Sequence, residues 1–408
     1  MRTRTPVGVG LGALWVLWTL GGCGGSSLSG VTSVGEAGSE AGGDGGPQLG
    51  SGDGGTFDGP GFDLDSGCAT ASARASRQPV YMLIVLDGSG SMSQENKWAA
   101  VVPALDAFFD DMRSRADTSF GVGLTVFSDQ ADPTCYLGSC NGPYTSIDVP
   151  IRYVDAAQAG ALHARIDSTQ PMADTPTVAV LEGQYPLLES FVPPSPLQRA
   201  GKKVLILMTD GVPNDPQNDP PASLQAACVT MAEDEFAKTP PAGPITTFAV
   251  GIGVYQPLDP SNYDPAFMGR LAVAGGAPNA GCNPNDTSDP TKFCHFQITP
   301  GNGKTAQQLE QEFVTAIDTI RGEISSCEFT LVQSDGGVGQ VDPTKVNVVY
   351  DDGSGNESVI PEDPQNGWTY DDPANPTAVI LHGAACDAMK KDAKGQVDIV
   401  LGCKTLAK

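Results

Sequence analysis

Basic residues are scarce in this chain, and histidine is almost absent. The 23 lysines and arginines stand against 48 aspartates and glutamates, which gives a net charge of −25, and there are 3 histidines in 408 residues. A chain this acidic repels nucleic acid and anionic lipid headgroups, so its composition argues against both as electrostatic partners. The scattered His163, His295 and His382 show none of the spacings typical of a zinc site. Such a negative charge favours cations as binding partners.

Long apolar runs are also missing, except near the amino terminus. There, Arg2 and Arg4 precede "VGVGLGALWVLWTL", which is too short and too rich in glycine for a spanning helix and is typical of an export signal. The run ends in "LGGC", which resembles the lipobox of bacterial lipoproteins. The resemblance implies a signal peptide over residues 1–22 and lipidation of Cys23. We therefore expect an exported protein, held at the outer membrane or cell surface by a lipid anchor only.

Cysteine is present in an odd number once the anchor is set aside. Nine of the ten cysteines remain after Cys23, so an exported chain should form disulfide bonds and leave one thiol over. Two pairs are close enough in sequence to bridge locally, but spacing alone fixes no connectivity. The candidates for disulfide bonds are Cys135, Cys140, Cys282, Cys294, Cys327, Cys386 and Cys403.

Hydrophobic patterning divides the mature chain into three regions. Residues 23–66 are rich in Gly, Ser and Asp and predict a disordered tether. Residues 67–326 alternate buried strands with amphipathic helices, which indicates an α/β fold: an open, mostly parallel sheet with helices on both faces. Residues 327–408 are short strands between Gly, Asp, Asn and Pro turns, which predict a small β-rich, cysteine-containing domain. Helices are predicted over 94–115, 155–167, 177–191, 222–237, 264–273 and 305–325.

Polar side chains follow several strands of the predicted sheet. Asp87 ends the strand "VYMLIVL" and Asp210 ends "VLILMT", while Thr175 lies in a loop just before a helix. Ligands of open α/β sheets bind at the carboxyl ends of the strands, so these residues should meet at one rim. Together with Ser89 and Ser91 they are hard oxygen donors, which suit Mg²⁺, Mn²⁺ or Ca²⁺.

The stretch "DGSGSMS" resembles the D-x-S-x-S signature of von Willebrand factor A (vWA) domains. The "TPT" loop and the strand ending in "TDG" follow in the family's order, and the resemblance covers residues 80 to about 326. It implies a metal-ion-dependent adhesion site, in which hydroxyls ligate the ion and aspartates often act through water. The implied residues are Asp87, Ser89, Ser91, Thr175 and Asp210, with Thr177 as the alternative to Thr175.

Such a site predicts a binding protein and not an enzyme. Neutral hydroxyls leave the charge of the ion partly uncompensated, so an open coordination position attracts a carboxylate. The expected function is an envelope lipoprotein whose vWA domain binds a divalent cation, preferably Mg²⁺, and through it an acidic residue of a partner protein or another carboxylate-bearing ligand. The alternatives are a structural envelope lipoprotein with an unused site and a metal-dependent phosphatase-like hydrolase.

The same stretch lacks residues that enzymes with similar motifs require. A haloacid-dehalogenase-like phosphatase needs a second aspartate where Ser89 stands. A serine hydrolase needs Gly-x-Ser-x-Gly, but Asp87 precedes Ser89 by two residues, and Ser89 precedes Ser91 by two. No histidine is placed to act as the base.

Two other motifs are predicted to be local structure only. "GKT" at residues 303–305 lies between a strand and a helix like a P-loop, but Ile298 stands where that motif needs glycine. We expect Thr305 to cap the helix instead, and no nucleotide to bind. A second Asp-Gly-Ser-Gly begins at Asp352 and leads to no helix, which predicts a hairpin turn.

Overall fold

The computed structural model describes residues 71–406 with several internal gaps. The gaps are residues 75, 131–134, 137–138, 141, 198–200, 215–218, 255–262, 302, 332–341, 353–355, 392–395 and 402–403. The predicted signal peptide, the predicted lipidation site Cys23, the predicted tether and Cys403 lie outside the described residues.

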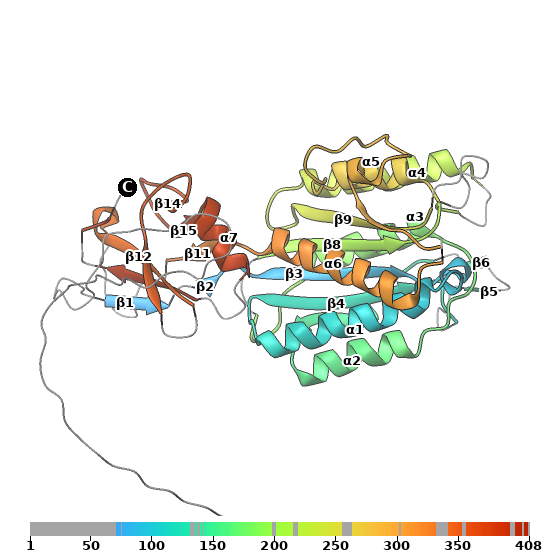
Figure 1. Cartoon of the computed structure of the whole chain (residues 1–408), viewed down its shortest axis with the longest axis horizontal. Coiled ribbons are helices and arrows are strands. Elements are labelled where there is room, and N and C mark those ends of the chain that lie inside the picture. Colours follow the sequence, from blue (N-terminus) through green and yellow to red (C-terminus); the bar gives the residue numbers. More distant parts are fainter. Residues whose placement is uncertain are drawn as a thin grey trace, which may run out of the picture. The chain divides into compact units, whose positions relative to one another are not determined.

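A six-stranded sheet with the order β10-β9-β8-β3-β4-β7 forms the centre of the larger part of the chain (Figure 1). Its strands are β3 (Val80–Asp87), β4 (Phe120–Phe127), β7 (Val149–Tyr153), β8 (Lys202–Thr209), β9 (Ile245–Ile252) and β10 (Phe296–Ile298). All neighbouring strands are parallel except β7, which pairs antiparallel with β4 at the edge. The fold class is therefore confirmed, and β7 lies at an edge, where Pro150 is tolerated.

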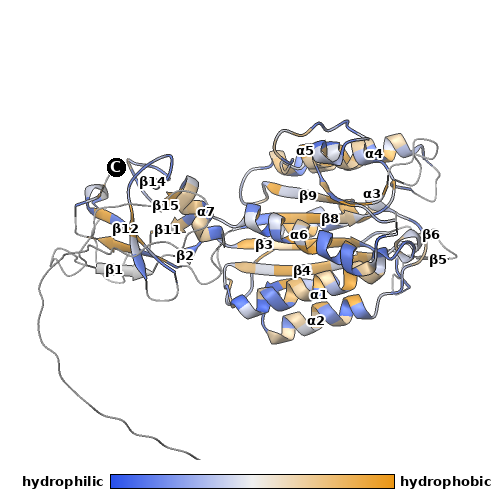
Figure 2. Cartoon of the chain, viewed as in Figure 1, coloured by the Kyte–Doolittle hydropathy of each residue, from blue (hydrophilic) through white to orange (hydrophobic). Residues whose placement is uncertain are grey.

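Helices cover both faces of this sheet, which is why β3 is buried along its whole length. The helices are α1 (Lys97–Arg115), α2 (Ala156–Asp167), α3 (Thr177–Glu189), α4 (Pro221–Ala237), α5 (Pro265–Ala274) and α6 (Ala306–Ile324). Met82 and Ile84 of β3 pack in one core with α1, α2 and α6, whereas Leu83 and Val85 pack in a second core with α3, α4 and α5. Successive side chains of a strand point to opposite faces, so a nearly continuous apolar run supplies both cores. The apolar colouring of the central strands in Figure 2 shows the same pattern.

The remaining strands form small antiparallel sheets. One has the order β1-β16-β12-β13, another β14-β15-β11-β2, and β5 pairs with β6. These strands are β1 (Ala71–Arg74), β2 (Ser76–Arg77), β5 (Cys135–Tyr136), β6 (Ser139–Cys140), β11 (Glu328–Thr330), β12 (Val346–Asp351), β13 (Glu357–Ile360), β14 (Trp368–Tyr370), β15 (Ala378–Leu381) and β16 (Gln396–Leu401). Helix α7 (Gly383–Lys391) and the 3-10 turns η1 (Gly90–Ser93), η2 (Pro290–Lys292) and η3 (Pro343–Lys345) complete the described elements.

The strands just before the central sheet pair with strands that follow it. β1 pairs with β16 and β2 pairs with β11, so residues 71–77 add strands to the C-terminal sheets and not to the central one. From the sequence, residues 67–79 are grouped with the α/β region, because the short segment "ASARASR" at residues 71–77 contains only Ala, Ser and Arg and carries little strand signal. Trp368 and Phe329 are buried in a separate C-terminal core. The division at residues 326 and 327 otherwise stays a prediction.

Candidate functional site

The candidate site lies where β3 and β8 end side by side. β3 and β8 are parallel neighbours with Leu86 opposite Met208, so Asp87 and Thr209 come next to each other. The Thr209 hydroxyl donates to Asp87 Oδ2 at 2.6 Å. Asp210 follows Thr209 directly. The carboxyl-end rim predicted from the sequence therefore brings both aspartates together.

In the loop after β3, two serines connect Asp87 to Asp210. The Ser89 amide donates to Asp87 Oδ1 at 2.8 Å, and the hydroxyl oxygens of Ser89 and Ser91 lie 3.0 Å apart. The Ser91 hydroxyl donates to Asp210 Oδ1 at 2.8 Å. Gly88 suits this close approach, because a Cβ would make a tight contact of 3.0 Å with the Phe127 carbonyl oxygen. The loop thus forms a continuous line of oxygens from β3 to the end of β8.

Thr175 reaches the same rim from the loop before α3. Its amide donates to Asn214 Oδ1 at 2.8 Å, and the Asn214 amide donates back to the Thr175 carbonyl at 3.0 Å. Gly211 permits the approach, because a Cβ there would lie 2.9 Å from Thr175 Oγ1. The alternative, Thr177, is fully buried, and its hydroxyl lies 3.5 Å from the Thr175 carbonyl oxygen. Thr175 therefore lies beside the residue that follows Asp210, and we retain it as the candidate.

The charges of the site are buried and unevenly compensated. Burial, together with the charge of Asp210, raises the pKa of Asp87 from 3.8 to about 7, although hydrogen bonds from Thr209 and Ser89 oppose the shift. Asp210 has a cationic partner: the Lys97 ammonium lies 2.7 Å from its Oδ2. Asp87 has no cation among the partners that shift its pKa. A cation bound between the carboxylates would relieve their repulsion.

The donor set fits a hard divalent cation. Among the described residues, no three His, Cys, Asp or Glu side chains gather in a group that could hold a metal. A metal at this rim would therefore need the hydroxyls of Ser89, Ser91 and Thr175 in addition to the two carboxylates. Hydroxyl and carboxylate oxygens are ligands that Mg²⁺, Mn²⁺ and Ca²⁺ accept. Ser91 is only half-buried, which leaves an approach from outside.

Sequence reasoning missed three residues of this rim. Thr209 lies directly before Asp210 and Asn214 lies four residues after it, so the segment "TDGVPN" could have indicated that both residues lie near Asp210. Lys97 had none, because it lies ten residues beyond Asp87 in the first turn of a helix. The two residues before it, Glu95 and Asn96, have left-handed φ values of 53° and 62°.

The cysteines divide into bonded and free. Cys282 bonds to Cys294, and Cys327 bonds to Cys386 across 59 residues. Cys228 is a free, buried thiol. The backbones of Cys135 and Cys140 are paired between β5 and β6. Bonding of these two and of Cys403 stays a prediction.

The "GKT" segment forms the predicted helix entry. Thr305 and Gln308 make a capping box at the start of α6, in which each side chain bonds the backbone of the other. The Lys304 ammonium donates to the Thr299 carbonyl at 2.8 Å and to Glu312 Oε1 at 2.5 Å. The lysine of this segment is therefore already bonded within the protein.

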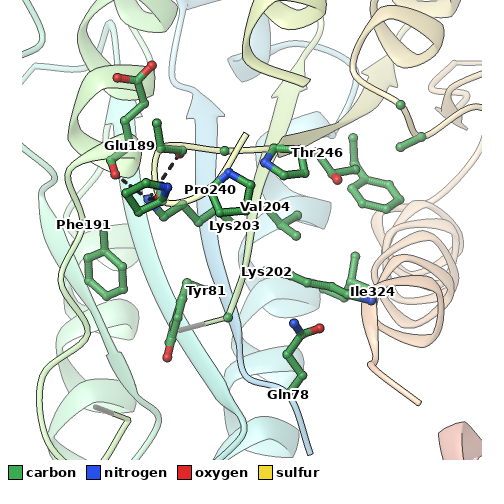
Figure 3. A pocket seen from close by; sticks show the side chains of 18 of the residues that line it. Gln78, Tyr81, Glu189, Phe191, Lys202, Lys203, Val204, Pro240, Thr246 and Ile324 are labelled. Atoms are coloured by element: carbon green, nitrogen blue, oxygen red, sulfur yellow. Dashed lines mark hydrogen bonds between the residues drawn. The ribbon is translucent and has the colours of Figure 1, made fainter. Parts of the chain in front are cut away.

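A cavity of about 1260 Å³ lies at the opposite ends of the strands. It is lined by residues at the starts of β8 and β9 and by apolar side chains such as Tyr81 and Phe191 (Figure 3). Lys203 in this cavity donates to the backbone carbonyls of Glu189 and Pro241. None of the five predicted site residues lines the cavity, so it is separate from the candidate site.

Comparison with known proteins identifies the α/β region. The family model of the von Willebrand factor type A domain matches residues 82–280, and this part of the chain belongs to that family. No curated protein matches the chain. No helix within the described residues is sufficiently long and apolar to cross a membrane.

Solved structures with similar folds come from several organisms. The pilus adhesin SpaC of Lactobacillus rhamnosus GG, in its open conformation, is 15% identical with a TM-score of 0.41, over 81% of this chain and 40% of SpaC. A von Willebrand factor type A protein of Catenulispora acidiphila is 14% identical with a TM-score of 0.37, over 84% of this chain and 67% of that one. Manganese-loaded TRAP protein of Plasmodium vivax is 18% identical with a TM-score of 0.35, over 60% of this chain and 76% of TRAP. This chain thus spans less than half of SpaC.

Proposed function

We propose that this protein is a lipid-anchored adhesion or interaction module of the cell envelope. Its vWA domain binds Mg²⁺, or Mn²⁺ or Ca²⁺ in its place, and through that ion a carboxylate of a partner protein. One observation carries the proposal: the unbroken contact from Ser89 Oγ to Ser91 Oγ to Asp210 Oδ1, which joins loops 119 residues apart in sequence. A turn without function needs no such long-range contact.

The roles of the residues follow from their positions. Ser89, Ser91 and Thr175 offer neutral hydroxyl oxygens, while Asp87 and Asp210 supply the negative charge that retains a cation. The bound ion would supply an incompletely neutralised charge to which an external carboxylate is attracted. Thr209 and Asn214 hold Asp87 and Thr175 in place, because each bonds one of them directly.

The partners of the three histidines support binding over hydrolysis. His163 contacts Asp106, His295 lies 3.0 Å from the Tyr263 hydroxyl, and His382 lies 2.7 Å from the Thr369 hydroxyl. Each is thus engaged away from Ser89 and Ser91. A serine nucleophile needs a base within hydrogen-bond reach, and in the described part of the chain the side-chain hydroxyls of Ser89 and Ser91 contact each other and Asp210.

Thermal unfolding of the purified full-length chain tests the metal. Mg²⁺ at a hundredfold excess over its dissociation constant should stabilise the wild type by about 2.7 kcal/mol relative to the protein in EDTA. Asp210→Ala should abolish that increase. Asp318→Ala, which changes a half-exposed carboxylate on α6, is the matched control and should keep it. Equal melting temperatures of the wild type in Mg²⁺ and EDTA would contradict the proposal.

Partner binding should require a loaded site. The net charge of −25 repels an acidic partner at long range, so attraction depends on the local charge of the ion. A synthetic peptide with an amidated C-terminus and a single glutamate should bind in Mg²⁺ and not in EDTA, and its Glu→Gln form, which has no carboxylate, should bind in neither. Metal binding without any carboxylate binding would leave the alternative of an envelope protein with an unused site.

The lipid anchor is tested separately. Cys23→Ser removes the acceptor of the acyl chains, so the variant should move from the membrane fraction to the soluble fraction. Cys228→Ser alters a thiol that is not the anchor and should leave the distribution unchanged. A Cys23→Ser variant that still partitions into detergent would disprove lipidation at this residue.

A further inference from the structure

Lys97 is a cation built into the candidate site. It is the first residue of α1, and only 10% of its side chain is exposed. A positive charge at a helix amino terminus opposes the helix dipole, and the first turn of α1 contains no acidic residue that would compensate. This lysine therefore contradicts the local preference of the helix, which is expected where a residue serves a site.

The ammonium of Lys97 occupies one side of the Asp210 carboxylate. Nζ lies 2.7 Å from Asp210 Oδ2 and 3.3 Å from the Ser91 carbonyl oxygen. The other oxygen, Oδ1, accepts from the Ser91 hydroxyl. Asp210 thus has one oxygen directed to the serine line and the other held by the lysine.

Charge counting shows what this ammonium changes. With both carboxylates ionised, Asp87, Asp210 and Lys97 together carry one net negative charge. A divalent cation then leaves the loaded site with one net positive charge, whereas without Lys97 the loaded site would be neutral. The same ammonium that repels an entering cation therefore makes the loaded site more attractive to an anion.

We propose that Lys97 sets the charge of the site: it weakens divalent-cation binding and, in exchange, strengthens binding of a partner carboxylate to the loaded ion. The inference rests on the proposed metal function. It assigns to Lys97 a positioning and charge-setting role toward Asp210 and not the role of a ligand.

Substitution of Lys97 separates the two effects. Lys97→Met keeps the length of the side chain and removes the charge, so Mg²⁺ affinity measured by calorimetry should rise about tenfold. Acetate affinity of the Mn²⁺-loaded protein, measured as the loss of water-proton relaxation when acetate displaces bound water, should fall about tenfold. Lys97→Arg retains the charge and should stay near the wild type in both measurements. Lys238→Met is the control, because Lys238 pairs with Glu235 at the far end of α4.

Thermal unfolding in EDTA gives a second readout, which does not depend on the binding of acetate. Lys97→Met leaves Asp210 without its cation, so in EDTA the variant should melt at a lower temperature than the wild type. On addition of Mg²⁺, the melting temperature of the variant should rise by more than that of the wild type. If this variant is too unstable in EDTA, purification in Mg²⁺ and comparison with Lys97→Arg preserve the test.

The outcomes distinguish this inference from the proposed function. A wild type that binds Mg²⁺ and a Lys97→Met variant that binds it equally or more weakly would overturn the role of Lys97 alone. Unchanged acetate affinity in Lys97→Met would also contradict it. If neither protein binds Mg²⁺ or Mn²⁺, both the inference and the proposed function fail.

Discussion

The sequence Asp-Gly-Ser-Gly occurs twice in this chain, from Asp87 and from Asp352, and the two aspartates contact different partners. Asp87 is fully buried at the end of β3 and accepts from Thr209 of the neighbouring strand. Asp352 accepts from the amide and side chain of Asn356, at 3.2 and 2.7 Å, in the connection between β12 and β13. The position that Ser91 holds in the first copy is Asn356 in the second. Asp87 therefore bonds across the sheet, whereas Asp352 bonds to a residue four positions further along the same connection.

This difference shows that the tetrapeptide does not make the site by itself. The first copy ends a strand that has parallel neighbours on both sides, so the carboxyl ends of other strands bring in Asp210 and the loops after them. The second copy joins two antiparallel strands, and its Asp352 accepts from Asn356 of the same connection. The neighbouring strands decide which aspartate meets a second carboxylate.

The largest difference in Mg²⁺ affinity is expected between the variants that lack Asp87 and Asp352. Asp87→Ala should lower Mg²⁺ affinity about 100-fold, because the residue supplies half of the acidic charge of the site. Asp352→Ala should leave it unchanged. Calorimetric titration of both variants and the wild type measures this. A loss of affinity in both variants, or in neither, would remove the distinction between the two copies.

Ser91 and Asn356, which follow the two Asp-Gly-Ser-Gly copies, should differ less in their effect on Mg²⁺ affinity. Ser91→Ala removes a hydroxyl that lies 3.0 Å from Ser89 Oγ and donates to Asp210, so Mg²⁺ affinity should fall about tenfold. Asn356→Ala should leave metal affinity intact and lower the free energy of unfolding by about 1 kcal/mol, because it removes one exposed side-chain hydrogen bond. Chemical unfolding and metal titration of the two variants check this pair. A Ser91→Ala variant with wild-type affinity would exclude Ser91 from the site.

Among the substitutions at the site, loss of the Thr209 hydroxyl should have the smallest effect on Mg²⁺ affinity. Thr209→Val retains the shape of the side chain but removes the donor to Asp87 Oδ2, so Asp87 is harder to ionise and Mg²⁺ affinity should fall a few-fold. The free energy of unfolding should also decrease, by about 1 to 3 kcal/mol, since a buried acceptor loses its partner. Titration and unfolding of this variant measure both. A reduction as large as that of Asp87→Ala would mean that Thr209 itself ligates the ion.

The sequence predicted the central sheet well because strand and helix periodicities differ strongly there. The predicted helix 155–167 is observed as Ala156–Asp167, and 305–325 as Ala306–Ile324. Helix α7 was overlooked, because nine residues between short strands contain too few turns to show a period. Pairing of residues 71–77 with β11 and β16 was also overlooked, since long-range partners leave no local pattern.

For the candidate site, the sequence located the oxygen donors but not what holds or balances them. Asp87 and Asp210 were placed correctly at one rim because both end apolar strands. Lys97 escaped because its contact with Asp210 joins residues 113 positions apart, and a long-range contact leaves no local pattern in the sequence. Local patterns therefore predict the candidate donors, whereas tertiary contacts such as that of Lys97 determine the charge around them.

An anomalous-scattering map of crystals of this protein grown with Mn²⁺ tests the central claim most directly, because it locates the ion without reference to affinity. The proposal predicts one manganese peak within coordinating distance of the hydroxyl oxygens of Ser89 and Ser91, on the rim that also holds Asp87 and Asp210, and no peak at Asp352. A fully loaded crystal in which manganese is absent from this rim, or lies only at other surface carboxylates, would contradict it.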